Sequence, residues 1–234
     1  GMILGENGIK MGKRYPEFVI NPSDIVRDYG ADTLRLYEMF MGPLEVSKPW
    51  SSAGVEGAKR FIVRVWNFFT EPANLTDDDD GALTKIYHQT VKKVTDDFEA
   101  LAFNTAISQL MIFMNAAYKA GKCPKEYAEG IIKMMSCITP HVCEEMWQKL
   151  GHNDTIAYEP WPVYDEKELV VDTIEIAVQI NGKVRGKINV GVDEDQDSAI
   201  AKAKANPDVA AAIEGKNIVK EIYVKGRIVN IVAK

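Results

Sequence analysis

The sequence predicts a mainly α protein, in which an antiparallel helix bundle is followed by a small α+β domain of β-β-α-β-β order. Apolar residues recur at helical spacing from Ser51 for about a hundred residues. From Ile174 the apolar period changes to two, and Asn181-Gly182 is typical of a two-residue hairpin turn. We therefore expect three parts, residues 1–48, 49–165 and 166–234.

Composition limits the class of protein. The 234 residues are 46% hydrophobic and 26% charged, as in ordinary globular domains, and no apolar run is long enough to span a bilayer. The net charge of -6 excludes a protein that binds nucleic acid non-specifically through its overall charge, so any RNA contact needs local basic patches. Three cysteines without a secretory signal favour reduced thiols and a cytoplasmic location.

Residues 1–48 have little core of their own. The apolar residues 2–4 predict a short strand, and residues 5–8 a turn that leads into a basic loop. Asn21 is expected to cap a helix that begins at Pro22 and ends at Gly30. Asp32 is expected to cap a second helix, which Gly42-Pro43 stops.

Five amphipathic helices should form the bundle, because each has one apolar face. An acidic break at residues 76–80 separates the first helix from the second, Gly121 is placed to end the third, and Thr139 is placed to cap the fifth. The predicted buried stripes begin at Val55, Leu83, Phe103, Tyr127 and Val142.

A connector rich in proline and acidic residues follows at about residues 152–170, and Trp161 in it should pack on the bundle. In the last part, strands are predicted around Ile174–Ile180, 183–190, 218–224 and 228–232, with helical segments at 198–205 and 206–213.

The basic loop, residues 8–14, places Lys10, Lys13 and Arg14 within five residues, with a glycine between the lysines. Cations on such a loop suit a polyphosphate, since they can neutralise charge that moves during phosphoryl or nucleotidyl transfer. A short basic run by itself is more often solvated surface.

The residues around the loop carry a family resemblance. Residues 8–14, followed by the stretches 21–26, 29–36, 41–44 and 54–57, resemble the KMSKS loop of class I aminoacyl-tRNA synthetases and the segment after it, and are most similar to bacterial leucyl-tRNA synthetases. The resemblance covers nearly the whole chain and implies a C-terminal piece, with the bundle of the anticodon-binding type.

The resemblance implies an activity for the parent enzyme, which activates leucine with ATP and Mg²⁺ and transfers it to tRNA(Leu). Lys13 matches the lysine that this family uses on the triphosphate, and Lys10 matches its supporting lysine. Gly12 and Arg14 stand where the family has serines. Leucine and ATP would be held mainly by the missing catalytic domain, so we expect no cofactor on this chain alone, and a monomer.

Three basic patches are candidate RNA contacts. Lys59, Arg60 and Arg64 lie on the polar side of the first bundle helix, and Lys85, Lys92 and Lys93 on the second. Lys183, Arg185 and Lys187 alternate, so we expect one strand face to carry three cations. Residues 179–187 also resemble the C-terminal domain of the leucyl enzymes, which reaches the tRNA.

A metal site is not expected. Cys137, His141 and Cys143 are close in sequence, but Pro140 interrupts the helix between them and no second Cys-x-x-Cys pair is present. Glu144 and Glu145 suit the first turn of a helix better than an acid/base pair.

Other readings stay open. A sister enzyme of the valyl, isoleucyl or methionyl type would share the loop and bundle but not the tail around residues 181–187. A stand-alone RNA-binding module would have no catalytic sequence upstream, and a protein-interaction bundle would bind no tRNA.

Overall fold

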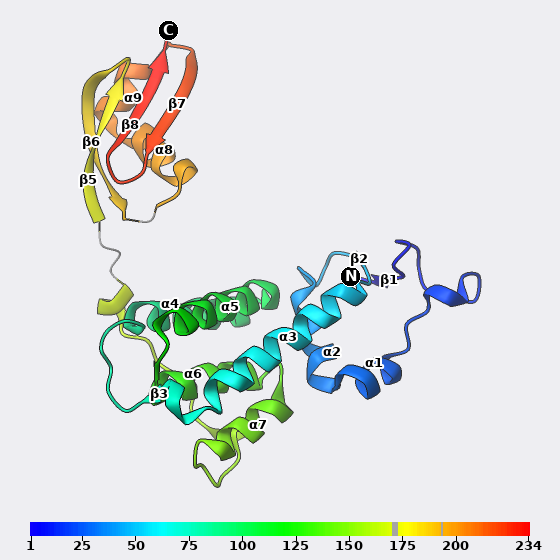
Figure 1. Cartoon of the computed structure of the whole chain (residues 1–234). Helices are drawn as coiled ribbons and strands as arrows, with labels where there is room; N and C mark the ends of the chain where they lie inside the picture. The colour runs from blue at the N-terminus through cyan, green and yellow to red at the C-terminus, as the bar shows by residue number, and fades with distance from the viewer. Residues whose placement is uncertain (170–172, 193) are drawn as a thin grey trace. The chain divides into compact units, whose positions relative to one another are not determined.

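The computed structural model describes residues 1–169, 173–192 and 194–234, which belong to two compact units. We call residues 1–169 the helical unit and residues 170–234 the tail (Figure 1). The chain is mainly helical and ends in a four-stranded mixed sheet, so the predicted fold class is confirmed. Each unit is described by itself.

The N-terminal segment contains one short strand, a single 3-10 turn at Pro16–Phe18 and two short α-helices. Strand β1 (Ile3–Leu4) pairs in parallel with β2 (Lys48–Pro49), which closes the segment on itself. Helix α1 (Pro22–Tyr29) begins as predicted, because the Asn21 side chain accepts a hydrogen bond from the Ser23 N–H. Helix α2 (Ala31–Phe40) follows directly after Gly30, whose φ of 94° ends α1.

Five helices form the bundle, and their bounds follow the apolar stripes. They are α3 (Ser52–Phe69), α4 (Thr84–Glu99), α5 (Phe103–Ala120), α6 (Lys125–Ser136) and α7 (Pro140–Lys149). Ser51 caps α3 by accepting from the Gly54 N–H. Gly121 ends α5 in the left-handed region, as predicted. One hydrophobic cluster runs through all five helices and α2, so the N-terminal segment shares the core of the bundle.

One predicted helix cap is wrong, and a second has the predicted position but lacks the capping hydrogen bond. Asp32 does not cap its own helix: the residue before α2 is Gly30, and no side chain caps that end. Thr139 precedes α7, but its hydroxyl donates to the Met135 carbonyl oxygen at 3.2 Å instead of capping α7. A second parallel pair, β3 (Leu75–Thr76) with β4 (Cys123–Pro124), was also not predicted.

The connector packs on the bundle through Trp161, as predicted. Its indole N–H donates to the Thr95 hydroxyl at 2.8 Å, and its ring lies against Phe98 with centroids 5.6 Å apart. The predicted end of the connector, at about residue 170, lies outside the described residues.

The tail is a sheet with helices on one face. Its strands are β5 (Thr173–Ile180), β6 (Lys183–Gly191), β7 (Ile218–Val224) and β8 (Ile228–Ala233), in the order β6-β5-β8-β7. Helices α8 (Gln196–Ala205) and α9 (Pro207–Ile213) cross over between β6 and β7. Their buried residues pack with Ile176, Val178 and Ile231 to form a second core. Strands β5 and β8 are parallel, and the other two pairs are antiparallel.

Candidate functional site

The basic loop begins with a closed turn. The Gly8 N–H donates to the Gly5 carbonyl at 2.8 Å, and Gly8 has a φ of 74°. Within this turn, the Glu6 carboxylate accepts from the N–H and hydroxyl of Ser52, which lowers the pKa of Glu6. The turn is therefore tied to the first residue of α3.

Met11 anchors the loop. It lines a small cavity of about 170 Å³ together with Ile3, Ile20, Pro22, Leu34, Glu38 and Trp50. Its sulfur also accepts a hydrogen bond from the Ile20 N–H at 3.4 Å. Burial raises the pKa of Glu38 in the same wall. The apolar residue between the two lysines thus fixes the loop against α2.

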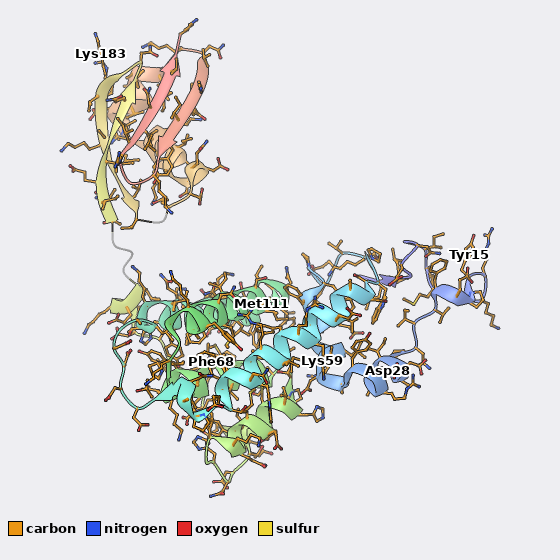
Figure 2. The ribbon with its side chains drawn as sticks, in the orientation of Figure 1. Tyr15, Asp28, Lys59, Phe68, Met111 and Lys183 are labelled. Atoms are coloured by element: carbon orange, nitrogen blue, oxygen red, sulfur yellow. The ribbon has the colours of Figure 1, made fainter. Side chains whose placement is uncertain are left out.

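The two loop lysines face solvent. Lys10 and Lys13 are exposed, and neither makes an ion pair or hydrogen bond within the parts of the chain that the structure describes. Arg14 lies 5.5 Å from the ring centroid of its neighbour Tyr15, which Figure 2 labels in this segment. All three cations are therefore available to an anionic ligand.

A polar contact joins the N-terminal segment to the far end of the bundle. The Asp32 carboxylate contacts His141 Nδ1 at 2.7 Å and accepts from the Val142 N–H at 2.7 Å, so it caps α7 from 110 residues away. Arg35 donates from Nε to the Ile138 carbonyl at 2.8 Å and from Nη2 to the Cys137 carbonyl at 3.1 Å. The sequence shows no signal for these contacts, because each partner sits in an ordinary helical pattern.

The cations of α3 are partly engaged within the helical unit. Lys59 donates to the Tyr29 carbonyl at 3.1 Å, and Arg60 lies 3.8 Å from Glu56, both at the surface (Figure 2 labels Lys59). Arg64 donates twice to the Asn115 side chain and lies 4.6 Å from the centroid of the Tyr118 ring. Arg64 therefore also joins α3 to α5.

The α4 patch is less available to an anion. Lys92 pairs with Asp96 at 2.5 Å, and Lys93 pairs with Asp97 at 2.6 Å. Each pair joins residues one helical turn apart, so the net charge of this face is low.

In the tail, the hairpin turn is as predicted but the alternation of its cations is not. Asn181 and Gly182 have φ values of 50° and 78°. The register shifts between Val178 and Gln179, which pair with Gly186 and Val184, so Arg185 is the extra residue of a β-bulge. The bulge breaks the two-residue period, and Lys183, Arg185 and Lys187 do not lie on one strand face. All three remain exposed.

The cysteine and histidine residues considered for a metal site differ in burial and in the residues that they contact. Cys143 is fully buried, and burial raises the pKa of its thiol to about 12, while Cys137 is exposed. His141 contacts Asp32 instead of either cysteine. Across the described residues, no group of three His, Cys, Asp or Glu side chains is placed to hold a metal ion, and no helix is long and apolar enough to cross a membrane.

Comparison with known proteins gives two findings. Residues 80–201 match the family model described as the anticodon-binding domain of tRNA ligase, which is more than half of the chain. The whole chain also superposes on part of LeuRS in the crystal structure of the ternary complex of Agrobacterium radiobacter K84 agnB2 LeuRS, tRNA and LeuAMS. That match has a TM-score of 0.67 and 27% sequence identity, and it spans 32% of the LeuRS chain.

Proposed function

The chain belongs to the family of anticodon-binding domains of class I tRNA ligases, and we propose that it is the C-terminal part of a leucine–tRNA ligase. The observation that carries the proposal is the match over all 234 residues to LeuRS, which extends beyond the family model to the basic loop and the tail. The chain spans about a third of that protein. The parent enzyme would join leucine to tRNA(Leu) with ATP, in the cytoplasm.

In this proposal the basic loop contacts ATP. Lys13 would contact the triphosphate, and Lys10 would support it electrostatically. Their exposure fits this role, and so does the absence of ion pairs and hydrogen bonds to them from the described residues, since a cation already paired within the protein would have to be released first. A bound ATP with Mg²⁺ would supply the activated phosphate for leucine. This chain would supply the two cations and, through Met11, their position relative to α2.

The lysines would act mainly on the transition state. An exposed ammonium gains little from a ground-state contact in water, but it gains more where negative charge builds up in a closed site. Gly12 gives the loop backbone freedom between the two cations. We therefore expect kcat to fall more than KM rises when either lysine is neutralised.

The bundle and tail would bind tRNA. The α3 cations Lys59, Arg60 and Arg64 are the proposed contacts of the helical unit, and Lys183 and Arg185 those of the tail. Lys187 is left out of this set, because its ammonium already pairs with Glu175 at 2.7 Å. Because Arg64 also holds α5, its replacement should cost stability as well as RNA affinity.

The test is aminoacylation by the full-length gene product. We expect it to charge tRNA with leucine, and not with valine, isoleucine or methionine. The variants Lys10→Ala and Lys13→Ala should each lower kcat by at least about tenfold, which corresponds to about 1.4 kcal/mol in the transition state. Lys48→Ala, an exchange in the same N-terminal segment, is the matched control. Full activity after both loop lysines are replaced would contradict the proposed role of the loop.

A further inference from the structure

One end of the tail sheet brings together four strand ends. Because β5 is antiparallel to β6 and parallel to β8, and β8 is antiparallel to β7, this end contains the last residues of β5 and β8 and the first residues of β6 and β7. Figure 1 shows the β5–β6 turn and the C-terminus at this end, and Figure 2 labels Lys183 there. Residues near 183, 217 and 234 therefore lie at the same end of the sheet, with 183 and 217 on its two opposite edge strands.

Hydrogen bonds fix this end of the sheet. The Asn181 side chain donates to the Ala233 carbonyl at 2.7 Å and accepts from the Ala233 N–H at 3.0 Å. Asn217 and Lys234 exchange two backbone hydrogen bonds, of 2.7 and 2.9 Å. The hairpin turn and the start of β7 are thus both tied to the last residues of β8.

Five exposed cations gather here, which we call the basic end: Lys183, Arg185, Lys216, Lys220 and Lys234. None of the five forms an ion pair with a residue that the structure describes; Lys216 donates only to a neutral carbonyl, that of Ala212, at 2.9 Å. The nearest acidic residues along the chain are Glu221, which follows Lys220 and pairs with Lys204 at 2.5 Å, and Glu214 in the loop before β7.

Lys187 differs from these five. Its ammonium pairs with Glu175 across the β5–β6 ladder at 2.7 Å, and this carboxylate raises the pKa of Lys187. The pair lies farther from the turn, toward the end of the sheet where the chain enters β5 and where Glu194, Asp195 and Asp197 begin α8. The Lys187–Glu175 pair is therefore set apart from the basic end along the strands.

We propose that the basic end is one continuous phosphate-binding surface for tRNA, formed by Lys216, Lys220 and Lys234 together with Lys183 and Arg185, and that Lys187 lies outside it. The proposal rests on the proposed function as a tRNA-binding part of a ligase. It extends the proposed tRNA contacts from the β5–β6 hairpin to cations at the start of β7 and the end of β8. Four strands spaced about 4.8 Å apart make a surface about 14 Å wide. A nucleic-acid duplex presents several phosphates over that width.

The test measures how the affinity of the 234-residue chain for labelled tRNA with a long variable arm changes with salt, by fluorescence anisotropy. Each phosphate contact contributes about 0.9 to the slope of log K against log salt on a duplex. The triple variant Lys216→Ala, Lys220→Ala, Lys234→Ala should therefore lower the slope by about 2 to 3 and weaken binding at 0.1 M salt on the order of 100-fold.

Two single variants are the controls. Lys187→Ala removes the paired cation, and Arg227→Ala removes an exposed cation at the opposite end of the sheet. Both should leave the slope unchanged, whereas Lys234→Ala alone should lower it by about 1. Two-dimensional amide NMR spectra verify that each variant keeps the fold of the tail.

An unchanged slope in the triple variant, or an equal loss in Lys187→Ala, would overturn the basic end as the binding surface. Binding of the wild-type chain to vesicles of anionic lipid but not to tRNA would overturn it too. The proposed ligase function fails separately, if the full-length gene product does not charge tRNA with leucine while the triple variant of this chain still loses tRNA affinity.

Discussion

Asp32 shows how one carboxylate can determine where two distant helices meet. It is 8% exposed, and both of its oxygens are used by the first turn of α7. An acidic group near the N-terminus of a helix is stabilised by the helix dipole as well as by the hydrogen bonds it accepts. The contact therefore holds the segment that carries the basic loop on the bundle.

Replacing this carboxylate should be costly. Asp32→Ala should lower the free energy of unfolding by about 2–3 kcal/mol, because it leaves the Val142 N–H without its charged acceptor. Asp24→Ala is the matched control: Asp24 pairs with Arg27 at the exposed surface, so its loss should cost less than about 1 kcal/mol. Urea denaturation followed by tryptophan fluorescence measures both. Equal losses in the two variants would contradict the role of Asp32.

Glu194 makes the stability of the tail depend on pH. Its carboxylate accepts hydrogen bonds from Lys202, Ser198 and the Gly191 N–H, which lower its pKa from 4.5 to about 2. A carboxyl group whose pKa is lower in the folded state stabilises that state at neutral pH, and the stabilisation is lost as pH falls from about 5 to 2.

We therefore expect the tail to become less stable between pH 5 and pH 2, as measured by amide hydrogen exchange of β6, and Glu194→Gln to weaken this dependence. The same substitution should destabilise the tail by about 1–2 kcal/mol at pH 7, because it removes the charge from three hydrogen bonds. All four tryptophans lie in residues 1–169, so fluorescence reports on the helical unit in the same sample. A pH dependence that survives the substitution in full would assign it to other carboxyl groups.

At the scale of elements, two glycines inside helices differ in the space that surrounds their Cα atoms. Gly57 in α3 has room for a methyl group, whose nearest neighbour would be the Arg60 guanidinium at 3.7 Å. Gly130 in α6 faces Tyr87, and a Cβ there would overlap the Tyr87 hydroxyl and ring. That ring is stacked on Tyr127 with centroids 4.0 Å apart, so it cannot move without loss of the stack.

Gly57→Ala should therefore stabilise the chain by about 0.5–1 kcal/mol, the gain in helix propensity. Gly130→Ala should destabilise it by about 1–3 kcal/mol, because the added methyl group overpacks the contact between α6 and α4. Thermal unfolding of the two variants in parallel gives the comparison. A stabilising Gly130→Ala would mean that Tyr87 can repack without cost.

The helices and strands were predictable where a local pattern determines them. The apolar stripe from Val55 and the Asn181-Gly182 turn each carry enough information within a few turns or residues. The Asp32 cap and the parallel pair β1–β2 were not predictable, because both depend on residues that are far away in sequence. The bulge at Arg185 also depends on the partner strand, so alternation alone placed Lys187 on the wrong face.

At the scale of the whole molecule, charge is divided unevenly. Residues 170–234 contain ten Lys and Arg against nine Asp and Glu, a net charge of +1, whereas residues 1–169 contain 18 against 25, a net charge of -7. The candidate basic residues could be named from the sequence, but their availability could not. The pairing of Lys187 with Glu175, and the position of Lys216 and Lys234 at the same end of the sheet as Lys183, follow only from the order of strands in the sheet.

The chain alone should not activate leucine. It supplies the basic loop, but neither of its two cores is a nucleotide-binding α/β fold: one is a helical bundle and the other a small mixed sheet. We expect no leucine-dependent exchange of pyrophosphate into ATP above a protein-free blank, with the full-length gene product as the positive control. Exchange by the 234-residue chain would refute this expectation and assign it a complete catalytic site.

The position of β8 in the sheet has a consequence for biosynthesis. This strand lies between β5 and β7, although it is the last of the four to be made. During translation, β5, β6, α8, α9 and β7 emerge first, and β5 and β7 cannot be joined until residues 228–233 have left the ribosome. The sheet can therefore close only after residues 228–233 have been synthesised, and until then the backbone N–H and C=O groups with which β5 and β7 pair to β8 are left as unpaired strand edges.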